Sequence, residues 1–418
     1  MTTHRRQRAL LGASGLIAAA TLTATAGAAG ISSASRIGSE HARAARAKST
    51  VTIPAIISET GSASFLGADE AKALVALEKA VNARGGIDGH PLKFDILDDQ
   101  STPTVAVSLA APLIHKTNVL LVGSITTTDR PVDALVTKAG PVIYDLSPGD
   151  HPRRGGFVYS AADSTVAQAH ALANFAKLKG WTRVAAITST DASGQDGWTS
   201  IQIATKADRL KVLDHETFAP TDTSVTSQLA TIKATNPQAL FIWTTGTPIG
   251  TVFKGMQQLG MENLPTFTTP GNESYAELTG FGSILPKQLY FPSPAFQSGP
   301  SHFSGALKTA IDQFDTAMKN AGVSVPDEGA SLSYDPANVI INALKAVGPF
   351  APAKKIRAYI NHLNHYAGAD GYYNFTSKKV APDQRGLGIH DVYVTMWDNA
   401  IKNWVGVTGS AGGNLLKK

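Results

Sequence analysis

The stretch from Val51 to Gly86 reads VTIPAIISETGSASFLGADEAKALVALEKAVNARGG, and its order of elements decides the fold. The apolar run VTIPAIIS predicts a short buried strand. A polar loop rich in serine and glycine, residues 58–67, follows that strand. Residues 68–83 then place apolar side chains near helical spacing, and Gly85 and Gly86 end the helix. A strand, a loop and a helix in this order are the first half of a β–α–β unit.

The same alternation continues along the chain. The strand-like runs LKFDILDD (92–99), NVLLVGS (118–124) and PVIYDLS (141–147) alternate with helical segments at 102–116 and 130–140. Strands that alternate with helices of this length predict a parallel sheet with helices on both faces. The fold class is therefore predicted to be α/β.

A second α/β unit follows a break at residues 151–164, which are rich in glycine and arginine. Within it we expect the segment DASGQDG (191–197) to be a loop, with a helix starting at Trp198. Residues 296–366 are predicted to be mostly helical. The last part of the chain reads as β-structure, with a turn at Asp398-Asn399.

The stretch from Met1 to Ala28 has the pattern of a signal peptide. Three arginines precede an apolar run of small residues, and Ala26-Gly27-Ala28 offers a cleavage site. The run is barely long enough for a membrane-spanning helix, which is the weaker interpretation. We expect export to the periplasm or the extracellular space, by either the general or the twin-arginine route. Residues 29–50 are predicted to be a disordered spacer.

Composition narrows the class of protein further. The chain has 418 residues, which favours two domains, and it contains no cysteine, which excludes disulfides and a lipid anchor on an N-terminal cysteine. The formal charge of +5 comes from the part of the chain before Ser49, so the remainder is close to neutral. A near-neutral body gives no electrostatic reason to expect a nucleic-acid partner.

Motifs that carry catalysis are missing from the sequence. There is no G-x-S-x-G elbow, no H-E-x-x-H pair and no P-loop. His362 and His365 are the histidines nearest to metal-ligand spacing, and we interpret them as solvated surface residues. The sequence therefore predicts no enzyme activity, no metal and no cofactor.

Hydroxyl- and glycine-rich segments follow the predicted strands in both units. They are the segments 58–67, 123–129 and 147–150 in the first unit, and STDASGQDG, WTTGTP and TPGNES in the second. Ligands of open parallel sheets bind outside the carboxyl ends of the strands, where helix N-termini suit an anion. If the two units face each other, these segments line one cleft of a hinged binding protein. For any single residue, ordinary helix capping is the alternative.

The order of these motifs resembles the type 1 periplasmic binding proteins, and within them the leucine/isoleucine/valine-binding branch that serves ABC transporters. The resemblance covers roughly residues 51–408 and rests on TGSASFLG, NARGGIDGHPLKFDILDDQSTPTVAV, LLVGSITTT, KGWTRVAAIT, QLGM and YDPANVIINAL. It implies two Rossmann-like lobes joined by three hinge crossovers. The first lobe would comprise 51–163 and 296–375, and the second would comprise 164–295 and 376–410.

The loop reading and the resemblance together give the candidate ligand-binding residues. The opening loop contributes Ser62, Ser64 and Leu66, and the resemblance places a ligand carboxylate at the hydroxyl of Thr126, beside Thr127. It also implies contacts near Asp145 and Ser147 and at Ser193, a position where the family often has an aromatic residue. The acid that binds the ligand's ammonium group in the family is displaced here, and the resemblance places it near Asn272 and Glu273. One alternative is that Asp145 or Asp191 binds the ammonium group of the ligand. The other alternative is that the ligand has no ammonium group.

The sequence thus predicts a monomeric solute-binding protein that delivers a small molecule to an ABC permease. A ligand-sensing receptor of the same fold and, less well supported, a secreted hydrolase are the alternatives. The ligand stays open among amino acids, aromatic acids, amides and short polyols.

Overall fold

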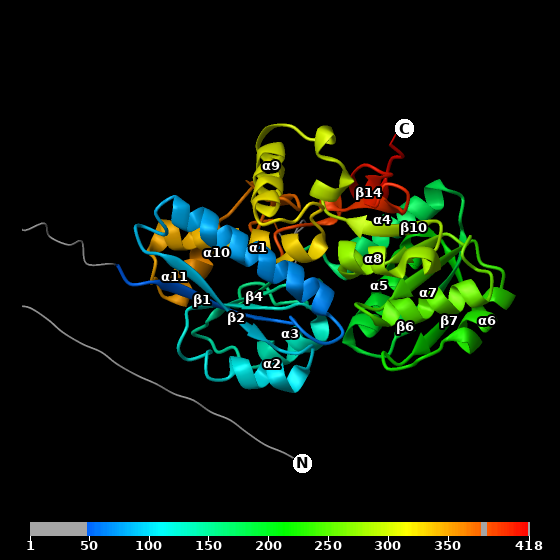
Figure 1. The fold of residues 1–418 in the computed structure, drawn as a ribbon, viewed down its shortest axis with the longest axis horizontal. Coiled ribbons are helices and arrows are strands. Elements are labelled where there is room, and N and C mark those ends of the chain that lie inside the picture. The colour runs from blue at the N-terminus through cyan, green and yellow to red at the C-terminus, as the bar shows by residue number, and fades with distance from the viewer. Residues whose placement is uncertain (1–47, 378–382, 417–418) are drawn as a thin grey trace, which may run out of the picture. The chain divides into compact units, whose positions relative to one another are not determined.

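The structure, a computed structural model, describes residues 48–377 and 383–416 (Figure 1). The predicted signal peptide and its cleavage site lie outside these residues, as does the predicted spacer up to residue 47. Within the described part, every helix is too short or too polar to cross a bilayer.

The first sheet has five parallel strands in the order β2-β1-β3-β4-β5. They are β1 (Val51–Ile57), β2 (Leu92–Asp98), β3 (Val119–Val122), β4 (Val142–Asp145) and β5 (Val158–Ser160). The connections contain α1 (Ser64–Ala83), α2 (Pro103–Ala110) and α3 (Thr126–Asp133). Strands such as β3 and β4 are buried along their whole length, as expected for strands covered on both faces.

The second sheet has seven strands in the order β14-β13-β10-β9-β8-β6-β7. They are β6 (Arg183–Ser189), β7 (Lys211–Phe218), β8 (Ala239–Trp243), β9 (Thr266–Thr268), β10 (Leu289–Ser293), β13 (Tyr393–Asp398) and β14 (Asn403–Gly406). The first five are parallel, and β13 and β14 add an antiparallel edge. The helices of this half are α4 (Thr165–Leu178), α5 (Ala192–Asp208), α6 (Thr226–Ala234), α7 (Pro248–Gln258) and α8 (Tyr275–Phe281).

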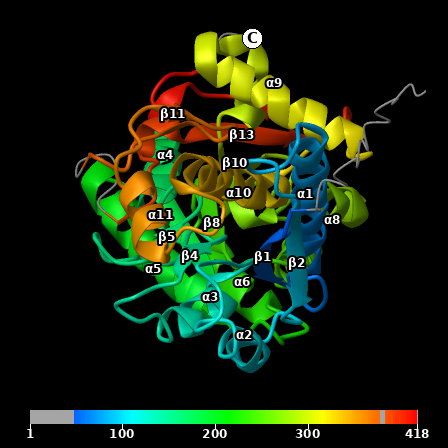
Figure 2. The same cartoon turned by 90° about the vertical axis from the view of Figure 1, so that its left-hand side faces the viewer.

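A later helical segment returns to the first sheet. It contains α9 (Gly305–Asn320), α10 (Glu328–Val347) and α11 (Ala353–Ile360), followed by the short strands β11 (Tyr366–Ala367) and β12 (Tyr372–Tyr373). Apolar residues of these helices share one buried cluster with β1–β5. Figures 1 and 2 show α10 lying beside α1, although the two helices are far apart in the sequence. The chain therefore passes between the two halves after β5, after β10 and after β12.

These observations confirm the predicted fold class, two α/β units with parallel sheets flanked by helices. Three helices begin earlier than the periodicity predicted, at Ser64, Thr126 and Ala192. The expected loop at 191–197 is wrong, because the Asp191 side chain accepts from the Gly194 amide at 3.0 Å and caps α5. The polar segments after β1, β3 and β6 thus end in the first turns of helices.

Candidate functional site

Both sheets have a point where the strand order reverses. In the first sheet it lies between β1 and β3, and in the second between β6 and β8. The segments that leave the carboxyl ends of neighbouring strands diverge there to opposite faces, which opens a crevice that suits a ligand. The helices α3 and α5, which follow β3 and β6, are in contact with each other. The two crevices therefore meet.

A small pocket lies where they meet. Its volume is about 20 Å³, and its walls come from both halves of the molecule: Ser124, Ile125, Thr126, Ser147, Pro148, Gly149, Thr165, Ser193, Asp196, Trp243, Thr245, Thr269, Gly271 and Leu332. The halves touch around it, since the Thr247 amide donates to the Ser62 carbonyl at 3.1 Å. The pocket is therefore nearly closed in this structure.

Hydroxyl groups form a matched pair on each side of the pocket. Thr126 Oγ1 and Ser147 Oγ lie 3.0 Å apart on the first side, and Ser193 Oγ and Thr245 Oγ1 lie 2.9 Å apart on the second. Each pair uses one proton for its internal hydrogen bond and keeps one to donate. Thr126 and Ser193 also lie in the first turns of α3 and α5, where backbone amides point outward. The pocket thus presents hydroxyl donors and two helix N-termini to an occupant.

One wall of the pocket carries a charge. Asp196 Oδ1 lies 2.7 Å from Nε2 of His151, which comes from the opposite half. His151 Nδ1 lies 3.5 Å from Asp383. Hydrogen bonds to these two carboxylates raise the pKa of His151 to about 9, so the imidazole is protonated at neutral pH. The pair is therefore an ionic link between the halves at the edge of the pocket.

Three of the sequence-predicted residues, Thr126, Ser147 and Ser193, line this pocket. Leu66 lies just behind it, buried with Ala63 and Ile125. The opening-loop serines do not line it: Ser62 is exposed, and Ser64 begins α1. Thr127 is half-buried, and its hydroxyl oxygen has no partner in the described structure.

The four remaining predicted residues do not line the pocket, and their contacts support the fold around it. Asp191 caps α5. Asn272 holds the chain around it, accepting from the Gly246 amide at 3.0 Å and donating to the Thr244 carbonyl at 2.8 Å. Glu273 is fully buried and accepts hydroxyl protons from Ser293 and Thr395. Burial raises the pKa of Glu273 to about 8, so it is protonated at neutral pH.

Asp145, one of the two alternative partners considered for an ammonium group, lies at the end of β4 and is completely buried. Burial, together with the nearby carboxylates of Asp133, Asp150 and Asp129, raises its pKa well above the usual range. A protonated carboxyl that faces other acids, and not the pocket, does not offer a negative charge to a ligand. The structure brings Asp196 to the pocket instead.

Three pocket residues, Asp196, Trp243 and Thr245, lie in the segments STDASGQDG and WTTGTP, which were expected to line the cleft, but none of the three was named as a candidate ligand-binding residue. Asp196 stood in the segment expected to be a loop, and its helical spacing from Ser193 was therefore not considered. The signal for Trp243 and Thr245 was present, because they lie at the end of β8 and just after it, at the second switch point. The residues around the pocket also contain no metal site: the described structure has no group of three or more metal-ligating side chains.

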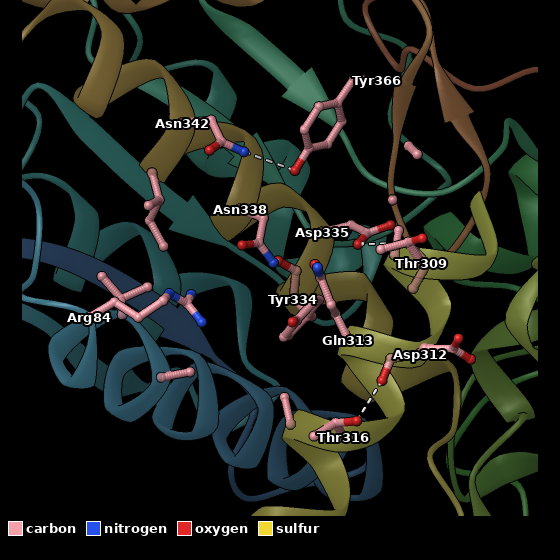
Figure 3. Close-up of a pocket in the computed structure, with 18 of the residues that line it drawn as sticks. Arg84, Thr309, Asp312, Gln313, Thr316, Tyr334, Asp335, Asn338, Asn342 and Tyr366 are labelled. Atoms are coloured by element: carbon pink, nitrogen blue, oxygen red, sulfur yellow. Dashed lines mark hydrogen bonds between the residues drawn. The ribbon is translucent and has the colours of Figure 1, made fainter. Parts of the chain in front are cut away.

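A second hollow, of about 780 Å³, lies between α1, α9 and α10, and none of the predicted site residues lines it (Figure 3). Its walls come from these helices and from residues 366–369, and they include Thr309 and Thr316 on α9 and Asn338 and Asn342 on α10. The hydroxyls of Thr309 and Thr316 donate to carbonyls of their own helix. The hollow is larger than the pocket, but its wall comes from one half of the molecule.

Comparison with known proteins agrees with this architecture. The family model described as periplasmic binding protein matches residues 50–402. Among solved structures, an extracellular ligand-binding receptor from Rhodopseudomonas palustris HaA2 superposes with a TM-score of 0.74 at 23% identity, covering 86% of this chain and 100% of that one. The branched-chain amino acid transporter substrate-binding protein LivJ from Streptococcus pneumoniae, in complex with isoleucine, gives 0.68 at 18% identity, covering 88% and 98%.

A fatty acid ABC transporter substrate-binding protein from Thermomonospora curvata gives a TM-score of 0.71 at 17% identity, covering 87% of this chain and 92% of that one. No curated protein matches the chain by sequence. The solved structures differ in the ligands that their names state, so they show the fold alone. Because the family model spans most of the sequence, the chain belongs to the periplasmic binding protein family, as its resemblance to the type 1 members predicted.

Proposed function

We propose that this chain is an extracytoplasmic solute-binding protein, which captures a small molecule between its two halves and delivers it to the permease of an ABC importer. The observation that carries the proposal is the pocket at the two switch points, whose walls come from both halves. A ligand held there contacts both halves at once, so it stabilises the state in which they are closed. The matched hydroxyl pairs and helix N-termini favour a ligand with a carboxylate or an amide.

Delivery to an importer is supported by the ABC transporter proteins among the structural neighbours. One of the structural neighbours is named as an extracellular ligand-binding receptor, so a role in sensing the ligand is the second candidate function. Loss of the gene should abolish uptake of the ligand by the cell if the chain serves a permease. If uptake is unchanged and only a cellular response to the ligand is lost, the chain is a sensor.

Binding itself is tested by a thermal-shift screen over amino acids, aromatic acids, amides and short polyols. A ligand at 100 times its dissociation constant adds about 2.7 kcal/mol to the free energy of unfolding. A separate assay for products released from ester and peptide substrates tests for hydrolysis, which we expect to be absent.

The site is tested by the substitution Thr126→Val, which keeps the shape of the side chain but removes the hydroxyl beside Ser147. We expect about ten- to a hundredfold weaker binding by calorimetry, the value of one hydrogen bond to a charged group. Thr309→Val in the hollow of Figure 3 is the matched control, and it should leave the affinity unchanged. If Thr309→Val weakens binding and Thr126→Val does not, the ligand binds in the helix hollow and the proposal is wrong.

A further inference from the structure

Asp196 is the one charged residue among the fourteen described residues that line the pocket. It is three positions after Ser193 on α5, and residues at this spacing share one face of a helix. Gly197, four positions after Ser193, packs against the indole of Trp243. The carboxylate of Asp196 and the indole of Trp243 therefore both belong to the second side of the pocket.

The two carboxylate oxygens of Asp196 have different surroundings. Oδ1 accepts from the protonated imidazole of His151 at 2.7 Å. Oδ2 is buried and has no hydrogen-bond partner in the described structure. A buried carboxylate oxygen without a donor is costly, because it has lost its hydration without replacement. The remaining lone pairs are thus available to a donor that an occupant of the pocket brings.

The other ionisable groups nearby do not take up this oxygen. Asp383, the second partner of His151, is bound by Arg385 through Nε at 2.7 Å. Arg130 binds Asp150 at 3.2 Å and donates to the Gly149 carbonyl. Both arginines already have a carboxylate, and neither of them lines the pocket.

We propose that Asp196 is the specificity-determining residue of the pocket and binds a positively charged nitrogen of the ligand through Oδ2, with Trp243 beside it. This rests on the proposed function, since it assumes that the ligand occupies the pocket between the halves. A carboxylate and an indole on one wall suit an ammonium group, by charge and by cation–π attraction. The hydroxyl pairs are left for the polar group at the other end of the ligand.

The alternative role for Asp196 is purely mechanical, as the partner of His151 that links the halves. The two roles predict different effects on the affinity for ligands with and without a basic nitrogen. A link between the halves strengthens the binding of every ligand alike. An ammonium partner strengthens only ligands that carry the nitrogen.

The test uses pairs of probes that differ only in the amine. The common L-amino acids and linear alkylamines are screened by thermal shift together with the matching carboxylates and alkanes that lack the nitrogen, and the best pair is measured by calorimetry. For the wild-type chain we expect the amine-bearing member to bind at least about tenfold more tightly. Asp196→Asn also breaks the ion pair with His151, so it should weaken both members, and it should weaken the amine-bearing member about ten- to a hundredfold more than the des-amino member.

His151→Gln is the matched control, because it removes the link between the halves and keeps the carboxylate. It should weaken the des-amino member and leave the preference for the amine-bearing member at least as large as in the wild-type chain, because it also removes a positive charge beside Asp196. The proposal is overturned if Asp196→Asn weakens both members equally, or if the best binder of the wild-type chain has no basic nitrogen. The wild-type comparison decides the matter even if the variant does not fold, and Asp196→Ser provides a second substitution.

The outcomes also separate this inference from the proposed function. If a probe binds and Thr126→Val weakens it while Asp196→Asn has no selective effect, the site stands and only the role of Asp196 is wrong. If no probe binds with or without an amine, or if neither substitution changes the affinity, both the site and this inference are wrong.

Discussion

Glu277 offers a direct measure of how acid burial controls the stability of this protein. It is the third residue of α8, only 2% exposed, and its Oε1 has no hydrogen-bond partner in the described structure. Burial alone raises its pKa from 4.5 to about 8. In the unfolded chain the group loses its proton above about pH 4.5, whereas in the folded chain it keeps the proton up to about pH 8. The folded state therefore binds more protons in this window, and its stability falls as the pH rises.

The substitution Glu277→Gln removes this dependence, because an amide does not titrate. Between pH 4 and pH 8, keeping Glu277 protonated costs the wild-type chain about 4 kcal/mol of unfolding free energy, at about 1.36 kcal/mol per pKa unit. The stability of the variant relative to wild type should therefore rise by about 4 kcal/mol over this range. The unpaired N–H of the new amide costs about 1–3 kcal/mol at every pH, so it cancels from the difference.

Urea unfolding of both chains at pH 4, 6 and 8 measures this difference. Thr309→Val, on α9, replaces a side chain that does not titrate and is the control, so its effect should not vary with pH by more than about 0.5 kcal/mol. A variation of less than about 1 kcal/mol for Glu277→Gln would show that the buried carboxylate is ionised and hydrated. The reasoning about acid burial would then be wrong.

Three further predictions concern the pocket and its supports. The imidazole of His151 should titrate near pH 9 by NMR. The stability that its ion pair adds is then fully present below about pH 6.5 and is lost as the pH rises through 9. A midpoint near 6.5 would contradict the ionic link. Gly197→Ala should destabilise the fold by about 1–3 kcal/mol in thermal unfolding, because the new Cβ would lie 2.1 Å from the Trp243 ring. Gly280 has open space around it, so Gly280→Ala should be neutral or stabilising. Asn272→Ala leaves buried backbone groups unpaired and should cost about 3 kcal/mol in urea unfolding; a cost below about 1 kcal/mol would show that the loop repacks.

The fold could be predicted because its signal is repeated along the chain. Most strands of the two sheets are short apolar runs followed by a polar segment and a helix, so errors in one element do not alter the class. The helix starts were less accurate. Asp191 caps α5 through its side chain, which periodicity does not detect, and α1 and α3 begin early without a side-chain cap, in polar residues that lack an apolar period.

The site was only partly predictable, because a strand end does not reveal the direction of its side chains. Asp145 and Ser147 are two positions apart at the end of β4, yet Ser147 faces the pocket and Asp145 is buried among other acids. Which of them meets a ligand depends on where the strand ends and how the chain turns after it. Asp196 depends on a longer-range event, the contact of α5 with the opposite half, which no local pattern contains.

The two sides of the pocket explain why it can orient a ligand. Each side has a hydroxyl pair and a helix N-terminus at a switch point, so the two α/β units supply nearly the same chemistry. A pocket built only from these parts would accept a ligand in either direction. The carboxylate of Asp196 and the indole of Trp243 occur on the second side alone. In our proposal, selectivity for the direction and the charge of the ligand depends on this one difference between the two sides, so substitutions at Asp196 should distinguish ligands and substitutions at Thr126 should weaken them all.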